Sequence, residues 1–419
     1  MRSVTISRVE AQDRRFPLHG GAGSDAVHTG AEYAFAVTRL RTAEGLDGCG
    51  IVLTLGNGND LVCAAIERYG ALIAGNEIEE LMSDFGAISR RLADDPALRW
   101  LGPHKGVVHL ALASLTNACF DLWAKARGVP LWRLLLDLTP EQVVALLDFS
   151  YIEDVLGAGE ATAMLRSQEP ARPARACVLK TGYPGYDTSV GWMQYDDTQV
   201  RDNVRCALDK GFRAFKLKVG SKSGERDLRR AAMLREVAGS SSRLMFDVNQ
   251  QWTLGEARRM CAALAAFDPF WVEEPTHPDD VLAHRTLAQE LPELRIALGE
   301  HVSNRVMFKN FMQAAAVHFV QADCTRVAGV AEFLTVSLLA RKFGLPLVPH
   351  VGDMGQIHQH LVLFNHIALG HEIVFLEHIP HMRHHFVHPA IVSGGVYRTP
   401  EEAGCSCDLI EAGTRAIAS

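Results

Sequence analysis

Seven ionisable residues recur at regular spacing through the second half of this chain, and each one follows or ends a short apolar run. Neighbouring members lie 23 to 29 residues apart. A lone acidic residue after an apolar run is usually a helix cap or a solvated loop residue. Seven residues in one phase, including both carboxylates and bases, instead indicate one site for metal binding and proton transfer. The seven are Lys218, Asp247, Glu273, Glu300, Asp323, His350 and Glu377.

Three successive members of this series are carboxylates. Asp247, Glu273 and Glu300 would repel one another in a cluster unless a cation neutralised them. Mg²⁺ suits such a set, because it prefers carboxylate oxygens and keeps open positions for substrate oxygens. Zinc is not favoured, because neither a cysteine nor a closely spaced histidine pair joins the set. We therefore expect these three residues to bind magnesium.

Two kinds of base accompany the carboxylates. Lys216 and Lys218 alternate with apolar residues, so both point to the same side of a buried strand. Adjacent positive charge and burial lower a lysine pKa, so we expect Lys218 to act as a base and Lys216 to bind a substrate carboxylate. His350 is the second base, and Asp323 would orient its imidazole. Bases on two sides of one carbon allow either epimerisation or β-elimination.

The elements that carry these residues alternate between short apolar runs and amphipathic helical patterns from about residue 200 onward. Alternation at this period predicts a parallel sheet with a helix after each strand. With residues 143–152 as a candidate first strand, it predicts an α/β fold, a (β/α)7–8 TIM-like barrel. The carboxyl ends of barrel strands meet at one mouth, where the seven residues would converge. The predicted strands are "FRAFKLKV", "SRLMFDVN", "FDPFWVEEP", "LRIALGE", "VHFVQAD", "LPLVPH" and "EIVFLEH".

Bulk composition limits the classes of partner. The 419 residues are 48% hydrophobic and 22% charged, which is enough for one large domain and a smaller one. A formal net charge of −7 and a pI near 6.2 give no reason to expect nucleic acid or an anionic membrane as partner. The N-terminus lacks a signal-peptide core, and the nine cysteines lie mostly in apolar segments, as reduced thiols do. We therefore expect a cytoplasmic protein that binds a small molecule.

The motifs at the predicted strand ends resemble those of the enolase superfamily, mandelate racemase subgroup. They read "KLK", "FDVNQ", "WVEEP", "LGEH", "QAD" and "VPH". Other stretches are similar to the L-fuconate dehydratase branch and to related L-galactonate dehydratases. They run nearly end to end: "GSDAV" at 23–27, "GNGND" at 56–60, "RWLGPHKGVVHLA" at 99–111, "GYPGYDTSVGW" at 182–192, "NRVMFK" at 304–309 and "LEHIPHMRHHF" at 376–386.

The resemblance implies a domain plan and a set of roles. An α+β capping domain would span 1–140, the barrel 141–390, and a C-terminal segment, 391–419, would return to the cap. A mobile loop near 19–30 would close over the substrate, and its glycines suit a hinge. A homo-oligomer is also implied. The roles are a base at Lys218, a His–Asp dyad at His350 and Asp323, Mg²⁺ ligands at Asp247, Glu273 and Glu300, a catalytic glutamate opposite the metal at Glu377, and substrate contacts at Ser24, Asp25, Asn249 and Glu377.

Together these features predict a Mg²⁺-dependent acid-sugar dehydratase. L-Fuconate is the expected substrate, converted to 2-keto-3-deoxy-L-fuconate by removal of the C2 proton and loss of the 3-hydroxyl. Dehydration of another acid sugar, such as L-galactonate, and epimerisation of an acid sugar are the alternatives. A non-catalytic binding paralogue is least favoured, because such a protein has no use for a costly cluster of charges.

One departure from the family pattern concerns substrate choice. Asp353 introduces a charge three residues after His350, on the loop that follows a predicted strand. We expect its carboxylate at the rim of the pocket, where it would accept a hydrogen bond from a distal substrate hydroxyl. L-Galactonate has a hydroxyl where L-fuconate ends in a methyl group, so such a contact would favour L-galactonate. The alternative is that Asp353 caps the following helix.

Overall fold

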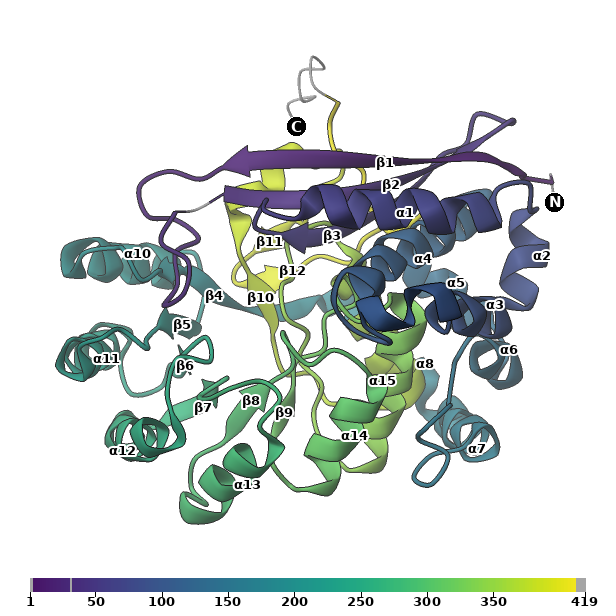
Figure 1. Ribbon diagram of the computed structural model, residues 1–419. Helices are drawn as coiled ribbons and strands as arrows, with labels where there is room; N and C mark the ends of the chain where they lie inside the picture. The colour runs from purple at the N-terminus through teal and green to yellow at the C-terminus, as the bar shows by residue number, and fades with distance from the viewer. Residues whose placement is uncertain (1–2, 31, 412–419) are drawn as a thin grey trace.

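Two sheets organise the chain, one antiparallel near the N-terminus and one mainly parallel in the remainder (Figure 1). The structure is a computed structural model and describes residues 3–30 and 32–411. The antiparallel sheet has the strand order β1–β2–β3, and both of its strand pairs are antiparallel. Its strands are β1 (Ile6–Pro17), β2 (Glu32–Thr42) and β3 (Gly48–Thr54).

Helix α4 (Gly106–Ala126) packs directly against β3 and β2, while α1 (Asn59–Ile73) packs on β1. The approach is close because Gly50 has no side chain, and the Ser114 hydroxyl hydrogen-bonds the Gly50 carbonyl at 3.0 Å. Of the described helices, α4 alone is long and apolar enough to cross a membrane, but 89% of that stretch is buried inside the protein. The smaller helices here are α2 (Ile78–Ser83), α3 (Phe85–Ala93), η1 (Pro96–Leu101), α5 (Leu131–Asp137) and α6 (Pro140–Ala145).

The second sheet contains parallel strands in the order β10–β4–β5–β6–β7–β8–β9. A helix follows each strand from β4 to β9, as the alternating pattern predicts (Figure 1). The strands are β4 (Tyr183–Gly191), β5 (Ala214–Lys218), β6 (Arg243–Asp247), β7 (Pro269–Glu273), β8 (Ile296–Leu298), β9 (Phe319–Val320) and β10 (Leu376–His378). The helices are α10 (Asp197–Asp209), α11 (Gly224–Ala238), α12 (Leu254–Leu264), α13 (Val281–Glu290), α14 (Arg305–Gln313) and α15 (Val330–Lys342).

Side-chain caps fix where these helices begin and so where each strand–helix loop ends. Asp196, Ser223 and Asn304 accept hydrogen bonds from backbone N–H groups in the first turns of α10, α11 and α14. Thr253 and Glu256 form a reciprocal capping box at the start of α12. Such caps satisfy N–H groups that a helix leaves unpaired at its N-terminus.

The parallel array is almost closed on itself. A single parallel bridge, Val320 with Leu347, extends it from β9 to residues 346–350, and β10 flanks β4 on the other side. In the described part of the chain no backbone ladder joins residues 346–350 to β10. The fold is therefore a mixed α/β arrangement around a parallel sheet. One seam remains, between residues 346–350 and β10, and side chains bridge it.

The proposed first strand at 143–152 is wrong. Residues 143–145 end α6, and the following residues form turns. The reason is local: Thr139 and Gln142 form a capping box that starts a helix just before the apolar run. The parallel sheet instead begins at β4, after α7 (Ala158–Gln168), η2 (Glu169–Ala171), α8 (Arg172–Arg175) and α9 (Val178–Thr181).

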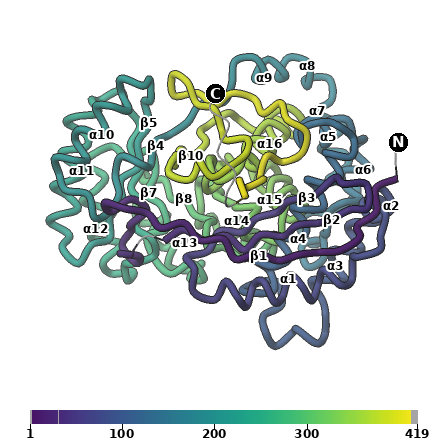
Figure 2. The backbone as a smooth tube through the Cα atoms, turned by 90° about the horizontal axis from the view of Figure 1, so that it is seen from above, coloured from purple at the N-terminus to yellow at the C-terminus, as the bar shows by residue number. Residues whose placement is uncertain are grey.

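The last described residues lie against the N-terminal half of the chain (Figure 2). Asp408 pairs with Arg39 of β2 and, at 2.6 Å, with Lys125 of α4. Asp121 of α4 accepts a hydrogen bond from the Cys405 N–H. The remaining elements are η3 (Ala265–Phe267), α16 (Ile357–Phe364), the π-helix η4 (Asn365–Leu369), η5 (Pro380–His385), β11 (Val392–Ser393) and β12 (Val396–Tyr397), and β12 pairs antiparallel with β4.

Candidate active site

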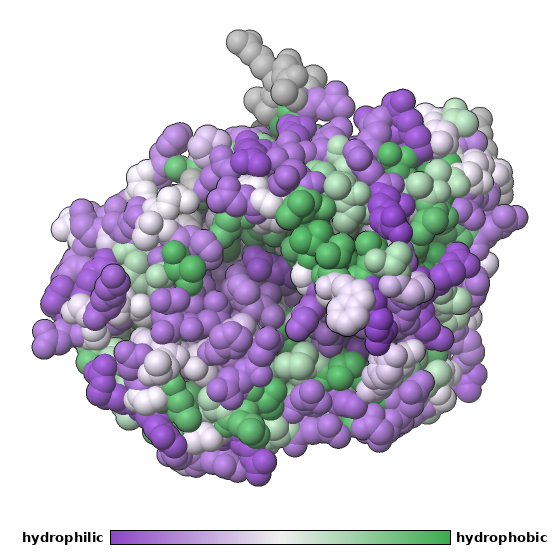
Figure 3. All heavy atoms as spheres, viewed as in Figure 1, coloured by the Kyte–Doolittle hydropathy of each residue, from purple (hydrophilic) through white to green (hydrophobic). Residues whose placement is uncertain are grey.

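A cavity of about 340 Å³ lies between the carboxyl ends of the parallel strands and the N-terminal elements. Figure 3 shows a hollow below the N-terminal elements, hydrophilic on its floor and hydrophobic along one flank. The polar lining comes from Asp25, Lys218, Glu300, His301, Arg326, His350 and Glu377. The apolar lining comes largely from β3, α1 and α4, as Leu53, Leu55, Leu61, Val62, Val107 and Leu110.

The three predicted metal ligands come together beside this cavity: Glu300 lines it, and Asp247 and Glu273 are buried next to Glu300. Asp247 and Glu273 are the last residues of adjacent strands, and Glu300 follows the next strand, so all three reach the same edge of the sheet. One carboxylate oxygen from each lies within 4.8 Å of the other two. Burial and the neighbouring Asp247 charge raise the pKa of Glu273 to about 7. The cluster is thus electrostatically costly unless cations accompany it.

The oxygen-rich donor set fits a hard divalent cation. Glu300 Oε2 is buried and has no hydrogen-bond partner among the described residues, although His350 Nε2 lies 3.5 Å away. Lysine ammonium groups now supply the positive charge, with Lys218 Nζ 2.6 Å from Asp247 and Lys216 Nζ 2.7 Å from Glu273. Carboxylate oxygens with a free lone pair are the ligands that Mg²⁺ prefers.

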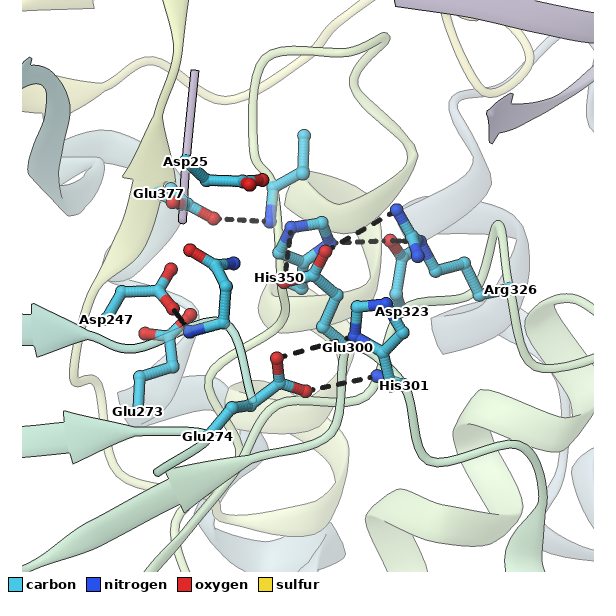
Figure 4. A network of polar contacts seen from close by, with 12 residues as sticks. Asp25, Asp247, Glu273, Glu274, Glu300, His301, Asp323, Arg326, His350 and Glu377 are labelled. Carbon is cyan, nitrogen blue, oxygen red and sulfur yellow. Dashed lines mark hydrogen bonds and ion pairs between the residues drawn. The ribbon is translucent and has the colours of Figure 1, made fainter. Parts of the chain in front are cut away.

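His350 and Asp323 form the predicted dyad. His350 Nδ1 lies 2.8 Å from Asp323 Oδ2, which leaves Nε2 on the side of Glu300 and the cavity (Figure 4). Burial lowers the His350 pKa, but the charges of Glu300 and Asp323 outweigh it and raise the pKa to about 9. The N–H and the hydroxyl of Thr325 hold the other Asp323 oxygen, each at 2.7 Å. The imidazole is therefore oriented to hold a proton in the cavity.

Both lysines differ from their prediction in the direction of the pKa shift, and Lys216 also differs in its position relative to the cavity. Burial lowers the pKa of Lys218, but Asp247 outweighs burial and the neighbouring Lys216, so the pKa is raised. Glu273 and Glu377 raise the pKa of Lys216 in the same way. Lys216 also does not line the cavity, because its 1% exposed ammonium is enclosed by three carboxylates. Lys216 therefore faces these carboxylates instead of the cavity, and its contact with a substrate carboxylate stays a prediction.

Glu377 lines the cavity and lies above Asp247 and Glu273 in Figure 4. Its Oε1 accepts a hydrogen bond from Thr188 and pairs with Lys216, and its Oε2 accepts one from the Val351 N–H. Burial opposes ionisation, but Lys216 and His350 lower the Glu377 pKa to about 2. Asn249 lies beside Asp247, to which its N–H donates, and its buried Oδ1 has no partner among the described residues.

The predicted closing loop contributes one of its two predicted residues to the cavity. Asp25 lines it and is fixed by N–H groups of Val27 and His28, at 2.7 and 2.6 Å. Ser24 is fully buried and faces away: its hydroxyl donates to the Gly21 carbonyl and accepts from the Gln194 N–H. Ser24 therefore fastens the loop to the residues just after β4, and its contact with substrate stays a prediction.

Asp353 is neither a rim residue nor a helix cap. It is 2% exposed and absent from the cavity lining. Its carboxylate accepts hydrogen bonds from the Ile379 N–H at 2.9 Å and from the Tyr397 hydroxyl. The following helix, α16, begins at Ile357, and its N-cap residue is Gln356, which makes no side-chain cap hydrogen bond. The Asp353 carboxylate, which was predicted to accept a hydrogen bond from a substrate hydroxyl, thus accepts hydrogen bonds from the protein itself.

Several lining residues were not predicted. His301 follows Glu300 directly, and Arg326 lies three residues after Asp323, with its guanidinium 3.5 Å from Glu300 Oε1. Nearness in the sequence to a predicted site residue was the available signal for both. Trp192 at the end of β4 places its ring 5.6 Å from Lys218 Nζ, within cation–π range. No spacing pattern singles out an aromatic residue of this kind.

Known proteins share both this fold and long stretches of sequence. A family model described as Enolase C-terminal domain-like matches residues 199–412. L-Galactonate dehydratase of Hypocrea jecorina is 40% identical over 98% of this chain and 93% of its own length. The crystal structure of human Mitochondrial enolase superfamily member 1 is 39% identical with a TM-score of 0.95, covering 97% of this chain and 95% of that one.

A third relative was solved with bound ligands. The crystal structure of L-talarate/galactarate dehydratase from Salmonella typhimurium LT2 liganded with Mg and L-lyxarohydroxamate is 25% identical, with a TM-score of 0.77, over 98% of this chain and 91% of that one. Magnesium is thus bound in a related structure, and the Asp247, Glu273 and Glu300 carboxylates could hold it here. The match along the whole chain, with the site geometry, shows that this chain belongs to the enolase superfamily.

Proposed function

We propose that this protein is a Mg²⁺-dependent dehydratase of a hydroxylated sugar acid, and that L-galactonate is the first substrate to test. The observation that carries the proposal is the arrangement of Lys218 and His350, two proton-transfer groups that line one cavity beside a carboxylate cluster. The 40% identity with an L-galactonate dehydratase supports this choice over L-fuconate.

The residues of the chain divide the reaction between two proton transfers. Lys218 removes the proton from C2, and His350, oriented by Asp323, protonates the departing 3-hydroxyl. Loss of that proton and of water leaves an enol, which becomes the 2-keto-3-deoxy acid. Bound at Asp247, Glu273 and Glu300, Mg²⁺ would supply the positive charge that stabilises a substrate carboxylate and would relieve the hold of Asp247 on Lys218.

Exchange of the C2 hydrogen with D₂O tests this assignment separately from dehydration. His350→Asn should retain exchange on L-galactonate with Mg²⁺ while 2-keto-3-deoxy acid formation is lost, and Lys218→Ala should lose both. Lys342→Ala, which removes a lysine paired with Glu160 outside the cavity, is the matched control and should keep full activity. Exchange in Lys218→Ala but not in His350→Asn would reverse the two roles, and the absence of keto acid from every sugar acid would refute the dehydratase.

L-Fuconate remains a narrower proposal for the same site. The apolar flank formed by Leu55, Leu61 and Val107 suits a terminal methyl group better than a hydroxyl. The ratio of kcat/KM for L-fuconate and L-galactonate decides between the two acids. A ratio above one would favour L-fuconate, and a ratio below one would favour L-galactonate.

An epimerase is the second candidate, because Lys218 and His350 are both placed to exchange protons with one bound molecule. Epimerisation would convert the substrate into its C2 epimer without forming a keto acid. NMR of the product mixture distinguishes the two reactions directly.

We also propose a cytoplasmic location. All nine cysteines are free, and Cys177 and Cys206 are exposed, which suits a reducing compartment. Cell fractionation with an antibody against the chain tests this, and recovery with a secreted fraction would refute it.

A further inference from the structure

The seam between residues 346–350 and β10 is bridged by carboxylates instead of a backbone ladder. Glu377 of β10 accepts the Val351 N–H at 2.9 Å, so a cavity-lining carboxylate holds the residue next to His350. In the opposite direction, Asp353 accepts the Ile379 N–H at 2.9 Å. Each side of the seam thus contributes one acid to the backbone of the other side.

The backbone between these two contacts is strained and close-packed. Val351 has φ 63°, and it is the one β-branched residue in the left-handed region among the described residues. That conformation is costly for a β-branched side chain and persists where its surroundings enforce it. Gly352 lies flat against β10: a Cβ there would stand 2.3 Å from the Glu377 carbonyl oxygen and 3.0 Å from the Tyr397 hydroxyl.

Asp353 is the centre of the contacts that enforce this backbone. Besides Ile379, it receives the Tyr397 hydroxyl, and His378 Nδ1 lies 2.6 Å from its Oδ2. The Tyr397 hydroxyl also lies 2.6 Å from the Glu377 carbonyl oxygen, so it joins both sides of the seam. All of these residues are buried or nearly so, which makes the geometry rigid.

We propose that Asp353, with Tyr397 and His378, is a positioning residue that fixes the position of His350 relative to Glu377 across the seam. His350 and Glu377 belong to the two segments that no ladder connects, residues 346–350 and β10, so their relative position depends on the two bridging carboxylates. Asp353 does not line the cavity and acts through the left-handed Val351. The proposal rests on the proposed function for its kinetic consequence only.

Asp353→Asn tests this role, because the amide keeps the volume but puts a donor where the carboxylate accepts. Formation of the 2-keto-3-deoxy acid, which needs His350 as the acid, should fall on the order of 10- to 100-fold in Asp353→Asn. Exchange at C2, which Lys218 carries out, and KM should stay within about twofold. Adding Asp353→Asn to His350→Asn should cost little more, because both changes remove the same contribution. Tyr397→Phe removes one of the donors and should have a smaller effect of the same kind.

The matched control is Asp121→Asn, which changes another buried carboxylate that accepts backbone N–H bonds, from Cys49 and Cys405, away from the cavity. It should lower stability without changing the ratio of exchange to dehydration. Equal loss of both half-reactions in Asp353→Asn, or no loss, would overturn the proposal.

A measurement without turnover separates this proposal from the proposed function. Amide hydrogen exchange over residues 350–354 and 376–380, followed by mass spectrometry, should accelerate in Asp353→Asn and stay unchanged there in Asp121→Asn. If no sugar acid reacts but this acceleration is seen, the dehydratase is refuted and the bracing of the seam stands. If the acceleration is absent, Asp353 does not hold the seam, whatever the enzyme does.

Discussion

Lys216 and Lys218 show that the type and position of a residue in the sequence do not determine its pKa. The alternation of "FKLK" places both side chains on one side of β5, where the structure also has them. Their pKa values move in the opposite direction from the prediction, because Asp247, Glu273 and Glu377 surround the ammonium groups. Those carboxylates come from β6, β7 and β10, so the period of a single strand could not reveal the balance.

Removal of one carboxylate from the cluster should weaken metal binding. Glu273→Gln keeps the shape of the side chain but removes a charge and an anionic ligand, so Mg²⁺ affinity should fall on the order of 10- to 100-fold or more, and turnover with it. Isothermal titration calorimetry measures the affinity without substrate. Glu332→Gln is the control, because Glu332 is a buried carboxylate that pairs with Arg305 outside the cavity. Wild-type Mg²⁺ affinity in Glu273→Gln would show that Glu273 is not a ligand. Full activity of the wild-type protein in excess EDTA would show that no metal is needed.

At the scale of elements, the close contact of β3 with α4 fixes one wall of the cavity. A Cβ on Gly50 would stand 1.9 Å from the Ser114 carbonyl oxygen and 2.6 Å from the Ala118 nitrogen, both backbone atoms that cannot turn aside. The same helix and strand supply Val107, Leu110 and Leu53 to the apolar flank. Separation of the two elements would therefore disturb both the core and the cavity.

Gly50→Ala should destabilise the protein by about 3 kcal/mol or more, because β3 and α4 must move apart. Gly159→Ala is the matched control: a Cβ there meets no atom within 4 Å, and Gly159 lies in the first turn of α7. That change should be neutral or stabilise by less than about 1 kcal/mol. Urea unfolding of the two variants measures the difference, and equal stability would contradict the steric argument.

At the scale of the whole molecule, buried neutral histidines make the fold sensitive to acid. Burial lowers the pKa of His109 and His360 to about 3 and that of His371 to about 4, from 6.5. The unfolded chain therefore binds protons that the folded protein does not, and stability falls as the pH drops below 6.5. His350 has the opposite sign: its raised pKa of about 9 contributes stability that is complete below 6.5 and is lost as the pH rises through 9.

His109→Leu should reduce this acid sensitivity. Neither ring nitrogen of His109 has a hydrogen-bond partner among the described residues, so the replacement leaves no polar group unpaired there. Each buried neutral histidine lowers the free energy of unfolding by about 2 kcal/mol between pH 6.5 and 5, at about 1.4 kcal/mol per pH unit. The loss of unfolding free energy between these two pH values, measured in urea, should be smaller by that amount in the variant. An unchanged loss would show that His109 is already protonated in the folded protein.

The sequence by itself determined which residues meet at the site. The run of apolar strands with a helix between them predicts a parallel sheet, and parallel strands bring their carboxyl ends to one edge. For that reason Asp247, Glu273, Glu300 and His350 could be assembled from spacing alone. The resemblance to the enolase superfamily added Asn249, which lies beside Asp247, and a role for Glu377, which lines the cavity. The local sequence pattern was enough to predict this meeting point, because the position of each residue is set by the end of its own strand.

Tertiary structure alone decided what surrounds each residue. Ser24 turned from the cavity because Gln194, about 170 positions later, offers its N–H, and Asp353 became buried because Ile379 and Tyr397 satisfy its carboxylate. The absence of a ladder at the seam and the raised lysine pKa values likewise depend on partners from distant strands. Hydrogen-bond partners and local electric fields are set by neighbours in space, and periodicity along the chain carries no information about them.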